Sequence, residues 1–234
     1  MKVYFIPGLG AKCNCFKFIE LPKGFEKVYI EWHLPEKKDS LCTYVQKMAE
    51  NIDQSEPFIL VGYSFGGVIA QEMNKFMKPE KTILIASMKD SIQIPGLFKI
   101  LKKMKFSTWF PMKFFTGKKM LSYAFMRSVY FNIKPSNNQK RNQIKLDEFM
   151  VDLDSDYFKW SIEQIINWLP EKECEKIYQV HGTKDIVFPF KKIHNSYLNT
   201  KNQGLEIVEK GSHLLVLELP KKVNKALEKI LLDK

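Results

Sequence analysis

The heptapeptide at 61–67 (VGYSFGG) constrains the fold of this chain more than any other segment. It follows an apolar run at 58–61, which predicts a buried strand, and it precedes a stretch with the composition of a helix. A serine between two such elements has to occupy a sharp strand-to-helix turn, in which neighbouring side chains collide. Glycine relieves that crowding at Gly62 and Gly66, two residues on either side of the serine. The pattern therefore predicts that Ser64 stands clear of the sheet edge as a nucleophile.

A serine hydroxyl is a poor nucleophile until a base accepts its proton, and that base needs a carboxylate to hold it. The chain has a candidate for each, in a loop that follows a predicted strand. His213 follows the strand-like run at 205–208, and Asp185 follows the run at 176–180. We therefore predict a catalytic triad of Ser64, His213 and Asp185. The order Ser, Asp, His along the chain is that of α/β-hydrolases and differs from the two unrelated protease orders.

Together these motifs resemble the α/β-hydrolase superfamily, and within it the serine esterases and lipases. The resemblance extends over about 3–231 of the chain. It implies that the backbone amides of Phe65 and Leu9 form an oxyanion hole, with Gly8 supporting the loop after the first strand. Many relatives have His-Gly where this chain has Pro7 before that glycine. The resemblance thus defines the amide of Phe65 more firmly than the second amide.

Other residues compete for the roles of acid and base. Asp90 follows the predicted strand at 81–86, and some α/β-hydrolases place the acid in that position. His181 lies at the end of a predicted strand, where packing or a hydrogen bond is the expected role. His33 and His194 have no motif around them.

Strand-like and helix-like segments alternate along the chain, which is typical of an α/β fold. We predict a doubly wound, mainly parallel six-stranded sheet, the α/β-hydrolase fold without the first two strands of its larger members. A helix is expected after Asp39 as its N-cap, and a last helix after Pro220. The expected strands are 2–6, 27–30, 58–61, 81–86, 176–180 and 205–209.

The span between the fourth and fifth strands is too long for a single crossover connection. We predict a core of 1–90 and 171–234 with a helical lid inserted at 91–170. Its 91–151 part has twelve Lys or Arg and two acidic residues, so that +10 of the chain's net charge of +11 lies there. The same part is rich in aromatic residues and methionine, which suits an apolar acyl substrate or peripheral contact with an anionic membrane. The alternative is that the apolar residues only pack the lid onto the core.

A run of acidic residues at the end of this insertion imitates a calcium-binding loop. Asp152, Asp154 and Asp156 alternate as ligands would, but Tyr157 stands where the loop needs glycine. We expect Asp154, Ser155 or Asp156 to cap a helix instead, which carries Phe158, Ile162, Ile165, Ile166 and Leu169.

No metal or organic cofactor is predicted, and no nucleic-acid-binding module is recognised. The four cysteines are too few and too scattered for a disulfide framework, and we find neither a secretory signal nor a membrane-spanning segment. A cytoplasmic location is therefore expected. Serine at the turn argues against the dehalogenase and epoxide hydrolase branches, whose nucleophile is a carboxylate.

The predicted function is cleavage of a carboxylic ester through an acyl-enzyme, on an apolar acyl substrate. Thioesterases and lysophospholipases use the same triad and remain alternatives within enzymes. A non-catalytic ligand-binding protein with this fold is the alternative of a different class.

Overall fold

The computed structural model describes residues 1–36, 38–105, 148–151, 154–170, 176–198 and 204–233. Within them, six strands form one sheet in the order β2-β1-β3-β4-β5-β6, and every neighbouring pair is parallel. Each predicted strand is present, with ends that differ by no more than two residues. The strands are β1 (Lys2–Ile6), β2 (Glu26–Tyr29), β3 (Phe58–Tyr63), β4 (Lys81–Ile85), β5 (Ile177–Gly182) and β6 (Leu205–Val208).

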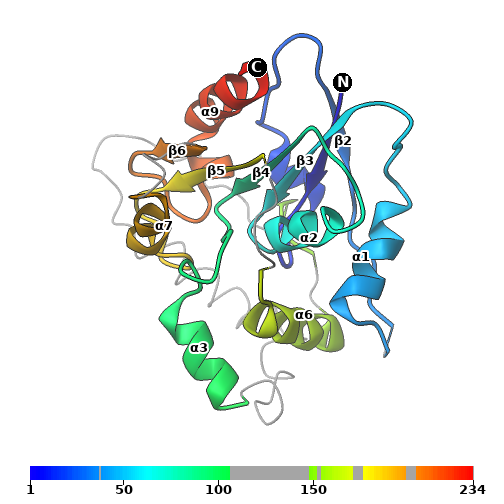
Figure 1. Ribbon diagram of the computed structural model, residues 1–234, viewed down its shortest axis with the longest axis vertical. Helices are drawn as coiled ribbons and strands as arrows, with labels where there is room; N and C mark the ends of the chain where they lie inside the picture. The colour runs from blue at the N-terminus through cyan, green and yellow to red at the C-terminus, as the bar shows by residue number, and fades with distance from the viewer. Residues whose placement is uncertain (37, 106–147, 152–153, 171–175, 199–203, 234) are drawn as a thin grey trace.

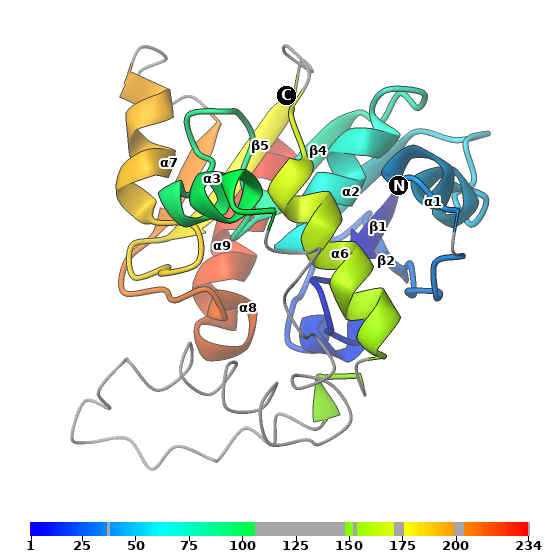
Figure 2. The ribbon, with the colours of Figure 1, turned by 90° about the horizontal axis from the view of Figure 1, so that it is seen from below.

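Helices cover both faces of the sheet (Figures 1 and 2). Side chains alternate between the faces of a strand, so Val3 and Phe5 of β1 join one apolar core while Tyr4 and Ile6 join the other. The 3-10 helix η1 and helices α8 and α9 pack on the first core, and α1, α2, α6 and α7 on the second. The described helices are η1 (Cys13–Phe16), α1 (Leu41–Ala49), α2 (Phe65–Met73), α3 (Gly96–Lys103), α6 (Ser155–Asn167), α7 (Phe190–Tyr197), α8 (Leu215–Glu218) and α9 (Pro220–Leu232).

Burial on both faces explains why the central strands were readable as apolar runs. Every residue of β3 is buried, as expected for a parallel strand between two helical layers. The fold places the carboxyl ends of all six strands at one edge, and the loops that leave this edge carry the candidate site residues.

The N-cap of α1 differs from the sequence prediction. Ser40, and not Asp39, caps the helix, because the Ser40 hydroxyl accepts a hydrogen bond from the amide of Thr43 at 3.2 Å. The Asp39 carboxylate instead accepts the amide of Glu36 at 2.8 Å and forms an ion pair with Lys47 at 3.0 Å. Ser40 thus caps the helix while Asp39 binds the segment before it and Lys47, and the helix begins one residue later than expected.

The N-cap of α6 is the predicted one. Asp154 accepts hydrogen bonds from the amides of Asp156 and Tyr157, both at 2.9 Å. Its carboxylate is therefore a helix cap, the role that we expected in place of calcium binding. The helix ends at Asn167, so Leu169 lies beyond it and is exposed, and the predicted apolar face is shorter by this residue.

Between β4 and β5 the described part of the insertion comprises α3, α6 and a short return segment at 148–151. Helix α3 lies beside α6 (Figures 1 and 2). The return segment pairs with the loop after β1, since Lys12 N–H donates to the carbonyl of Phe149 at 2.8 Å and Val151 N–H to that of Gly10 at 2.9 Å. Most of the aromatic and basic residues of the predicted lid, at 106–147, lie outside the described residues. Among the described helices, none is both long enough and apolar enough to cross a membrane.

Candidate active site

The turn between β3 and α2 has the strained geometry that its sequence predicts. β3 ends directly before Ser64 and α2 begins directly after it, and Ser64 has φ 52° and ψ −118°. A Cβ atom on Gly62 would lie 2.3 Å from the carbonyl oxygen of Gly66. A Cβ atom on Gly66 would lie 2.2 Å from the carbonyl oxygen of Ile6 in β1. Backbone atoms occupy both places, so both positions require glycine.

Three loops at the carboxyl edge of the sheet bring Ser64, His213 and Asp185 into contact. His213 lies in the turn between β6 and α8, and Asp185 lies between β5 and α7. The Nε2 atom of His213 is 2.9 Å from the Ser64 hydroxyl, and its Nδ1 atom is 2.9 Å from Oδ2 of Asp185. The three candidate residues thus form one hydrogen-bonded row. His213 and Asp185 are buried, and Ser64 is partly exposed.

Close packing of two loops explains why Asp185 reaches His213. A Cβ atom on Gly182 would lie 2.2 Å from the carbonyl oxygen of Gly211, and Lys184 N–H donates to the same carbonyl at 2.8 Å. The loop after β5, which contains Asp185, and the loop after β6, which contains His213, are therefore held against each other.

The other oxygen of Asp185 is held by its own loop. Oδ1 accepts hydrogen bonds from the amides of Val187 at 2.8 Å and Phe188 at 2.9 Å. Burial of the carboxyl acts to raise its pKa, but the charge and hydrogen bond of His213, with smaller effects of His181 and the Phe188 amide, outweigh it, and the pKa of Asp185 lies below its usual value. The carboxylate is therefore ionised and fixed in orientation.

The competing residues have other partners. Asp90 accepts hydrogen bonds from the amides of Ile92 at 2.8 Å and Gln93 at 3.1 Å, which closes the turn after β4. His181 is fully buried, with Nε2 at 2.8 Å from the carbonyl oxygen of Phe188 and 3.5 Å from Oδ2 of Asp185. Burial lowers the pKa of His181 and favours the neutral ring. His181 therefore has the hydrogen-bonding role expected of it.

The two predicted oxyanion amides belong to segments that adjoin the serine. Phe65 is the first residue of α2, and its N–H belongs to the first turn, where no carbonyl within the helix can accept it. The loop that contains Leu9 passes against Ser64, since a Cβ atom on Gly8 would lie 3.0 Å from the Cβ of Ser64. Gly8 thus has a close-approach role, in addition to Gly62 and Gly66.

Two aromatic residues at the site were missed by the sequence analysis. The hydroxyl of Tyr63 donates to the carbonyl of His213 at 3.0 Å and so ties the histidine loop to the end of β3. Trp32, which follows β2, donates from its indole N–H to the carbonyl of Gly8 at 3.2 Å. Tyr63 stands beside the serine in the glycine motif and could have been suspected, whereas no motif surrounds Trp32.

Aromatic rings also connect the insertion to the site. Trp32 stacks on Phe65 with ring centroids 5.6 Å apart, and Tyr157 of α6 contacts Trp32 at 6.0 Å. Trp160 of α6 contacts Phe65 at 6.5 Å. Helix α6 of the insertion therefore packs on Phe65, which follows the serine, and on Trp32.

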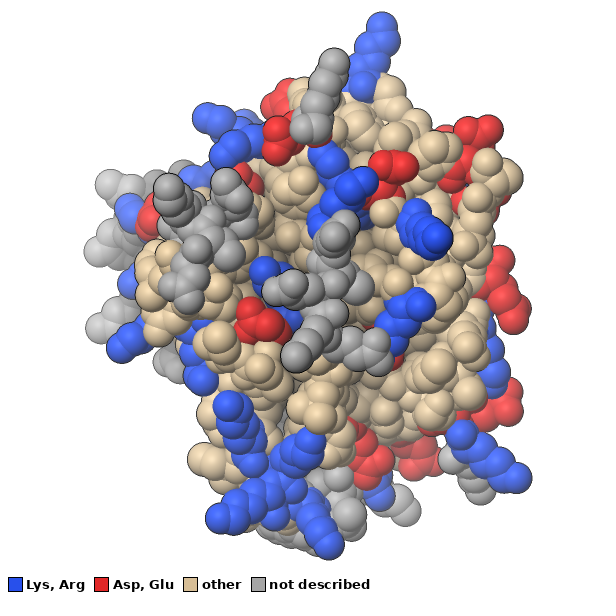
Figure 3. All heavy atoms as spheres, viewed as in Figure 1, with Lys and Arg blue, Asp and Glu red and all other residues tan. Residues whose placement is uncertain are grey.

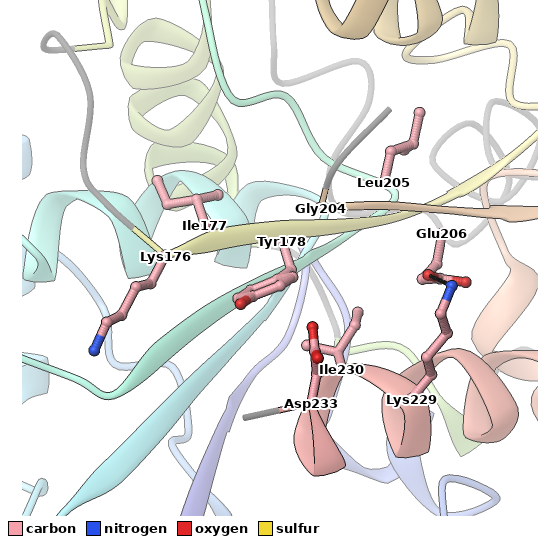
Figure 4. A pocket seen from close by; sticks show the side chains of 9 residues that line it. All are labelled: Lys176, Ile177, Tyr178, Gly204, Leu205, Glu206, Lys229, Ile230 and Asp233. Carbon is pink, nitrogen blue, oxygen red and sulfur yellow. Dashed lines mark hydrogen bonds and ion pairs between the residues drawn. The ribbon is translucent and has the colours of Figure 1, made fainter. Parts of the chain in front are cut away.

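A separate pocket lies at the opposite end of β5 and β6, between these strands and the C-terminal part of α9 (Figure 4). Its volume is about 520 Å³, and Glu206 and Lys229 form an ion pair of 2.5 Å on its wall. This pocket is formed at the amino ends of the strands, remote from the loops that carry Ser64, Asp185 and His213.

Comparison with known proteins identifies the fold. No protein-family model matches the sequence, and no curated protein matches it either. Solved structures do match over almost the whole chain. A hydrolase from Pseudomonas aeruginosa is 14% identical, with a TM-score of 0.70, over 99% of this chain and 90% of its own. A carboxylesterase from the ammonia-oxidizing thaumarchaeon Nitrososphaera gargenis is 15% identical, with a TM-score of 0.67, over 98% of this chain and 89% of its own.

A methylesterase from Arabidopsis is 18% identical, with a TM-score of 0.61, over 99% of this chain and 98% of its own. Each of the three thus matches 98% or 99% of this chain, whose described strands form one parallel six-stranded sheet between helices. The chain therefore has the α/β-hydrolase fold.

Proposed function

We propose that this protein is a serine hydrolase that cleaves a carboxylic ester through an acyl-enzyme. The observation that carries the proposal is the hydrogen-bonded row from Asp185 through His213 to Ser64, with both contacts at 2.9 Å. A serine oriented in this way toward a buried imidazole and carboxylate is the arrangement that activates a hydroxyl for attack on a carbonyl. Structural neighbours that are carboxylesterases and methylesterases support the choice of an ester.

The reaction follows from the positions of the three side chains. Ser64 Oγ attacks the ester carbonyl while His213 Nε2 accepts the hydroxyl proton, and Asp185 stabilises the imidazolium through Nδ1–H. The carbonyl electron pair moves onto the oxygen, which the amides of Phe65 and Leu9 hold. When the tetrahedral intermediate collapses, the C–O bond to the alcohol breaks and His213 returns the proton to the departing oxygen.

Water completes the cycle, in which it is the nucleophile and Ser64 Oγ is the leaving group. His213 accepts a proton from a water molecule, whose oxygen attacks the acyl carbonyl, and the bond to Ser64 then breaks as the proton passes to Oγ. The products are the alcohol and the free acid, and the enzyme returns to its starting state. Thioesters and lysophospholipids can enter the same sequence, because the triad acts on the carbonyl and not on the leaving group.

The direct test is the intact mass of the protein after exposure to a fluorophosphonate. An activated serine displaces fluoride and retains the phosphonyl group, so we expect one adduct on the wild-type protein and none on Ser64→Ala. Asp185→Ala should react more slowly. A folded wild-type protein that forms no adduct would contradict the proposal and favour the alternative, a ligand-binding protein with this fold. In that case titration of candidate esters should show tight binding without turnover.

We further propose that residues 91–170 act as a lid over the site and that its basic part contacts an anionic membrane. Among the described residues, Leu97 and Ile100 of α3 and its C-cap residue Met104 are 61%, 57% and 51% exposed, at the spacing of one helical stripe. Lys99 and Lys102 are exposed on the same helix, together with Lys103. Figure 3 shows lysine side chains gathered at the end of the molecule where Figure 1 places α3. An apolar stripe beside lysines suits the surface of an anionic bilayer.

Flotation with lipid vesicles tests this contact independently of turnover. The protein should float with vesicles of phosphatidylcholine and phosphatidylserine, and salt should weaken the binding through screening. The double variant Leu97→Ser, Ile100→Ser should bind the vesicles less than the wild type does. The single variant Lys102→Glu should also bind them less. Lys221→Glu, on the exposed face of α9, is the control for a change of charge and should bind as the wild type does. Equal binding by all variants would refute a role of α3.

We also propose that the protein acts in the cytoplasm. The thiols of Cys13, Cys15 and Cys42 are free, which supports a reducing compartment.

A further inference from the structure

We propose that Trp32 is a positioning residue for the oxyanion hole, which holds the candidate amides of Leu9 and Phe65 in their orientations. The proposal rests on the hydrolase function proposed above and assigns to Trp32 an effect on the transition state without contact with the substrate. The observation behind it is that one side chain contacts the peptide unit that carries one candidate amide and the side chain of the residue that carries the other.

The first contact concerns the peptide unit between Gly8 and Leu9. The carbonyl of Gly8 accepts two hydrogen bonds, from the indole N–H of Trp32 at 3.2 Å and from the amide of Ala11 at 3.0 Å. A trans peptide unit is planar, so its C=O and its N–H point in opposite directions. Two donors that hold the Gly8 oxygen therefore also set the direction of the Leu9 N–H. This peptide unit runs close to the serine, since a Cβ atom on Gly8 would lie 3.0 Å from the Cβ atom of Ser64.

The second contact concerns the turn after the serine. The ring of Trp32 lies nearly parallel to that of Phe65, with an interplanar angle of 8° and centroids 5.6 Å apart. Phe65 is fully buried and begins α2, so a ring packed flat against it limits movement of the first turn of that helix. The same indole thus supports the second amide as well.

The indole itself is held in place from its other sides. Tyr44 of α1 stacks on it at 6.2 Å and 25°, and Tyr157 of α6 contacts it at 6.0 Å. A ring enclosed in this way cannot rotate its N–H away from the Gly8 carbonyl without disturbing its neighbours. Donors that need no reorganisation during the reaction are the most effective at stabilising an oxyanion.

A second hydrogen-bonded connection holds the loop from the side of the insertion. Lys12 and Gly10 pair with the return segment at 148–151 through the bonds of 2.8 and 2.9 Å described above. The oxyanion loop is therefore held at three points along the five residues from Gly8 to Lys12, and Trp32 supplies the side-chain hydrogen bond to the peptide unit that carries the Leu9 N–H.

The variant Trp32→Phe separates positioning from packing, because it keeps an aromatic ring against Phe65 and deletes the N–H that reaches Gly8. We expect kcat for a p-nitrophenyl ester to fall roughly tenfold, less than the 10²- to 10³-fold loss of a whole oxyanion donor, with KM and Tm near those of the wild type. Tyr44→Phe is the matched control. It removes a hydroxyl from the same aromatic cluster, one that donates to His33 at 2.7 Å, and should leave kcat and KM unchanged.

A second substitution covers the case in which Trp32→Phe lowers Tm. Replacing Trp32 by benzothienylalanine keeps the size and shape of the indole and exchanges only N–H for sulfur, and the same fall in kcat is expected. Wild-type kcat in this isostere would overturn the proposal. Reaction with the fluorophosphonate keeps the two proposals apart, since a wild-type protein without an adduct on Ser64 contradicts the hydrolase function itself. If the fluorophosphonate labels Ser64 in the wild type and in the benzothienylalanine variant at equal rates, only the role of Trp32 is contradicted.

Discussion

The substitution Asp185→Asn should abolish turnover by changing the tautomer of His213 while leaving the fold intact. Oδ1 of Asp185 accepts two backbone N–H groups, from Val187 and Phe188, and Oδ2 faces Nδ1 of His213. An asparagine can present its oxygen to only one of these sides. If the amide nitrogen of the asparagine faced Val187 and Phe188, the backbone N–H groups of both residues would lose their acceptor. Each lost hydrogen bond would destabilise that orientation by about 1–3 kcal/mol. The oxygen therefore stays with the backbone, and the nitrogen faces His213.

The consequence for His213 follows from that orientation. Its Nδ1 atom now meets an N–H donor and must act as the acceptor, so the ring proton moves to Nε2. An Nε2 that already carries a proton cannot accept one from the Ser64 hydroxyl 2.9 Å away. The equivalent change in a serine protease lowers kcat by about 10⁴-fold, and we expect a loss of the same order here. That corresponds to about 5.5 kcal/mol of activation free energy.

Steady-state hydrolysis of a p-nitrophenyl ester and the rate of phosphonylation of Ser64 measure this loss. Asp90→Asn is the matched control, because Asp90 also follows a strand and also accepts two backbone amides, so that its asparagine variant retains the accepting oxygen. We expect the control to keep wild-type kcat. Activity of Asp185→Asn within about tenfold of the wild type would refute the tautomer reasoning. Loss of activity in Asp90→Asn alone would transfer the role of the acid to that residue.

Two further predictions concern stability. Gly66→Ala should lower the free energy of unfolding by about 3 kcal/mol or more, because its Cβ would lie 2.2 Å from a backbone oxygen of β1. Gly96→Ala, where a Cβ meets nothing within 4 Å, should change it by at most about 1 kcal/mol in the stabilising direction. Urea unfolding measures both, and equal values would contradict the steric account. His181→Gln should flatten the acid dependence of stability. Burial lowers the pKa of His181, so the unfolded state binds more protons below its ordinary pKa of about 6.5, and wild-type stability is lost as pH falls through that value. Because the pKa of His33 is also lowered, the unfolding free energy of the variant should still depend on pH, but less steeply than that of the wild type. An unchanged difference between unfolding free energies at acidic and neutral pH would contradict this assignment.

Local chemistry made a large part of this molecule predictable from the amino-acid sequence. The turn at Ser64 is governed by contacts between backbone atoms a few residues apart, and only glycine at 62 and 66 meets them. A strand that is buried on both faces has to be apolar, which is why the central strand β3 was visible as an apolar run. The order of Ser64, Asp185 and His213 along the chain then indicated which loops meet at the sheet edge.

Residues whose roles depend on distant contacts could not be predicted in the same way. Asp90 and Asp185 are equivalent as carboxylates after strands, and the choice between them is made where Gly182 packs on Gly211 and draws one loop to His213. The N-cap of α1 was misplaced by one residue for a similar reason, since Lys47 and the Glu36 amide occupy Asp39 and leave the cap to Ser40.

Trp32 shows the limit most clearly. Its indole is 24 residues from Gly8 and more than 120 from Tyr157 in the chain, and nothing in its sequence neighbours indicates either contact. The sequence by itself determined the strained serine turn, the buried strands and the set of candidate side chains, because these follow from backbone sterics and from the period of apolar residues. Only the tertiary structure decided which carboxylate faces His213 and which ring holds the loop beside Ser64, because packing between loops distant in sequence selects among chemically equivalent groups.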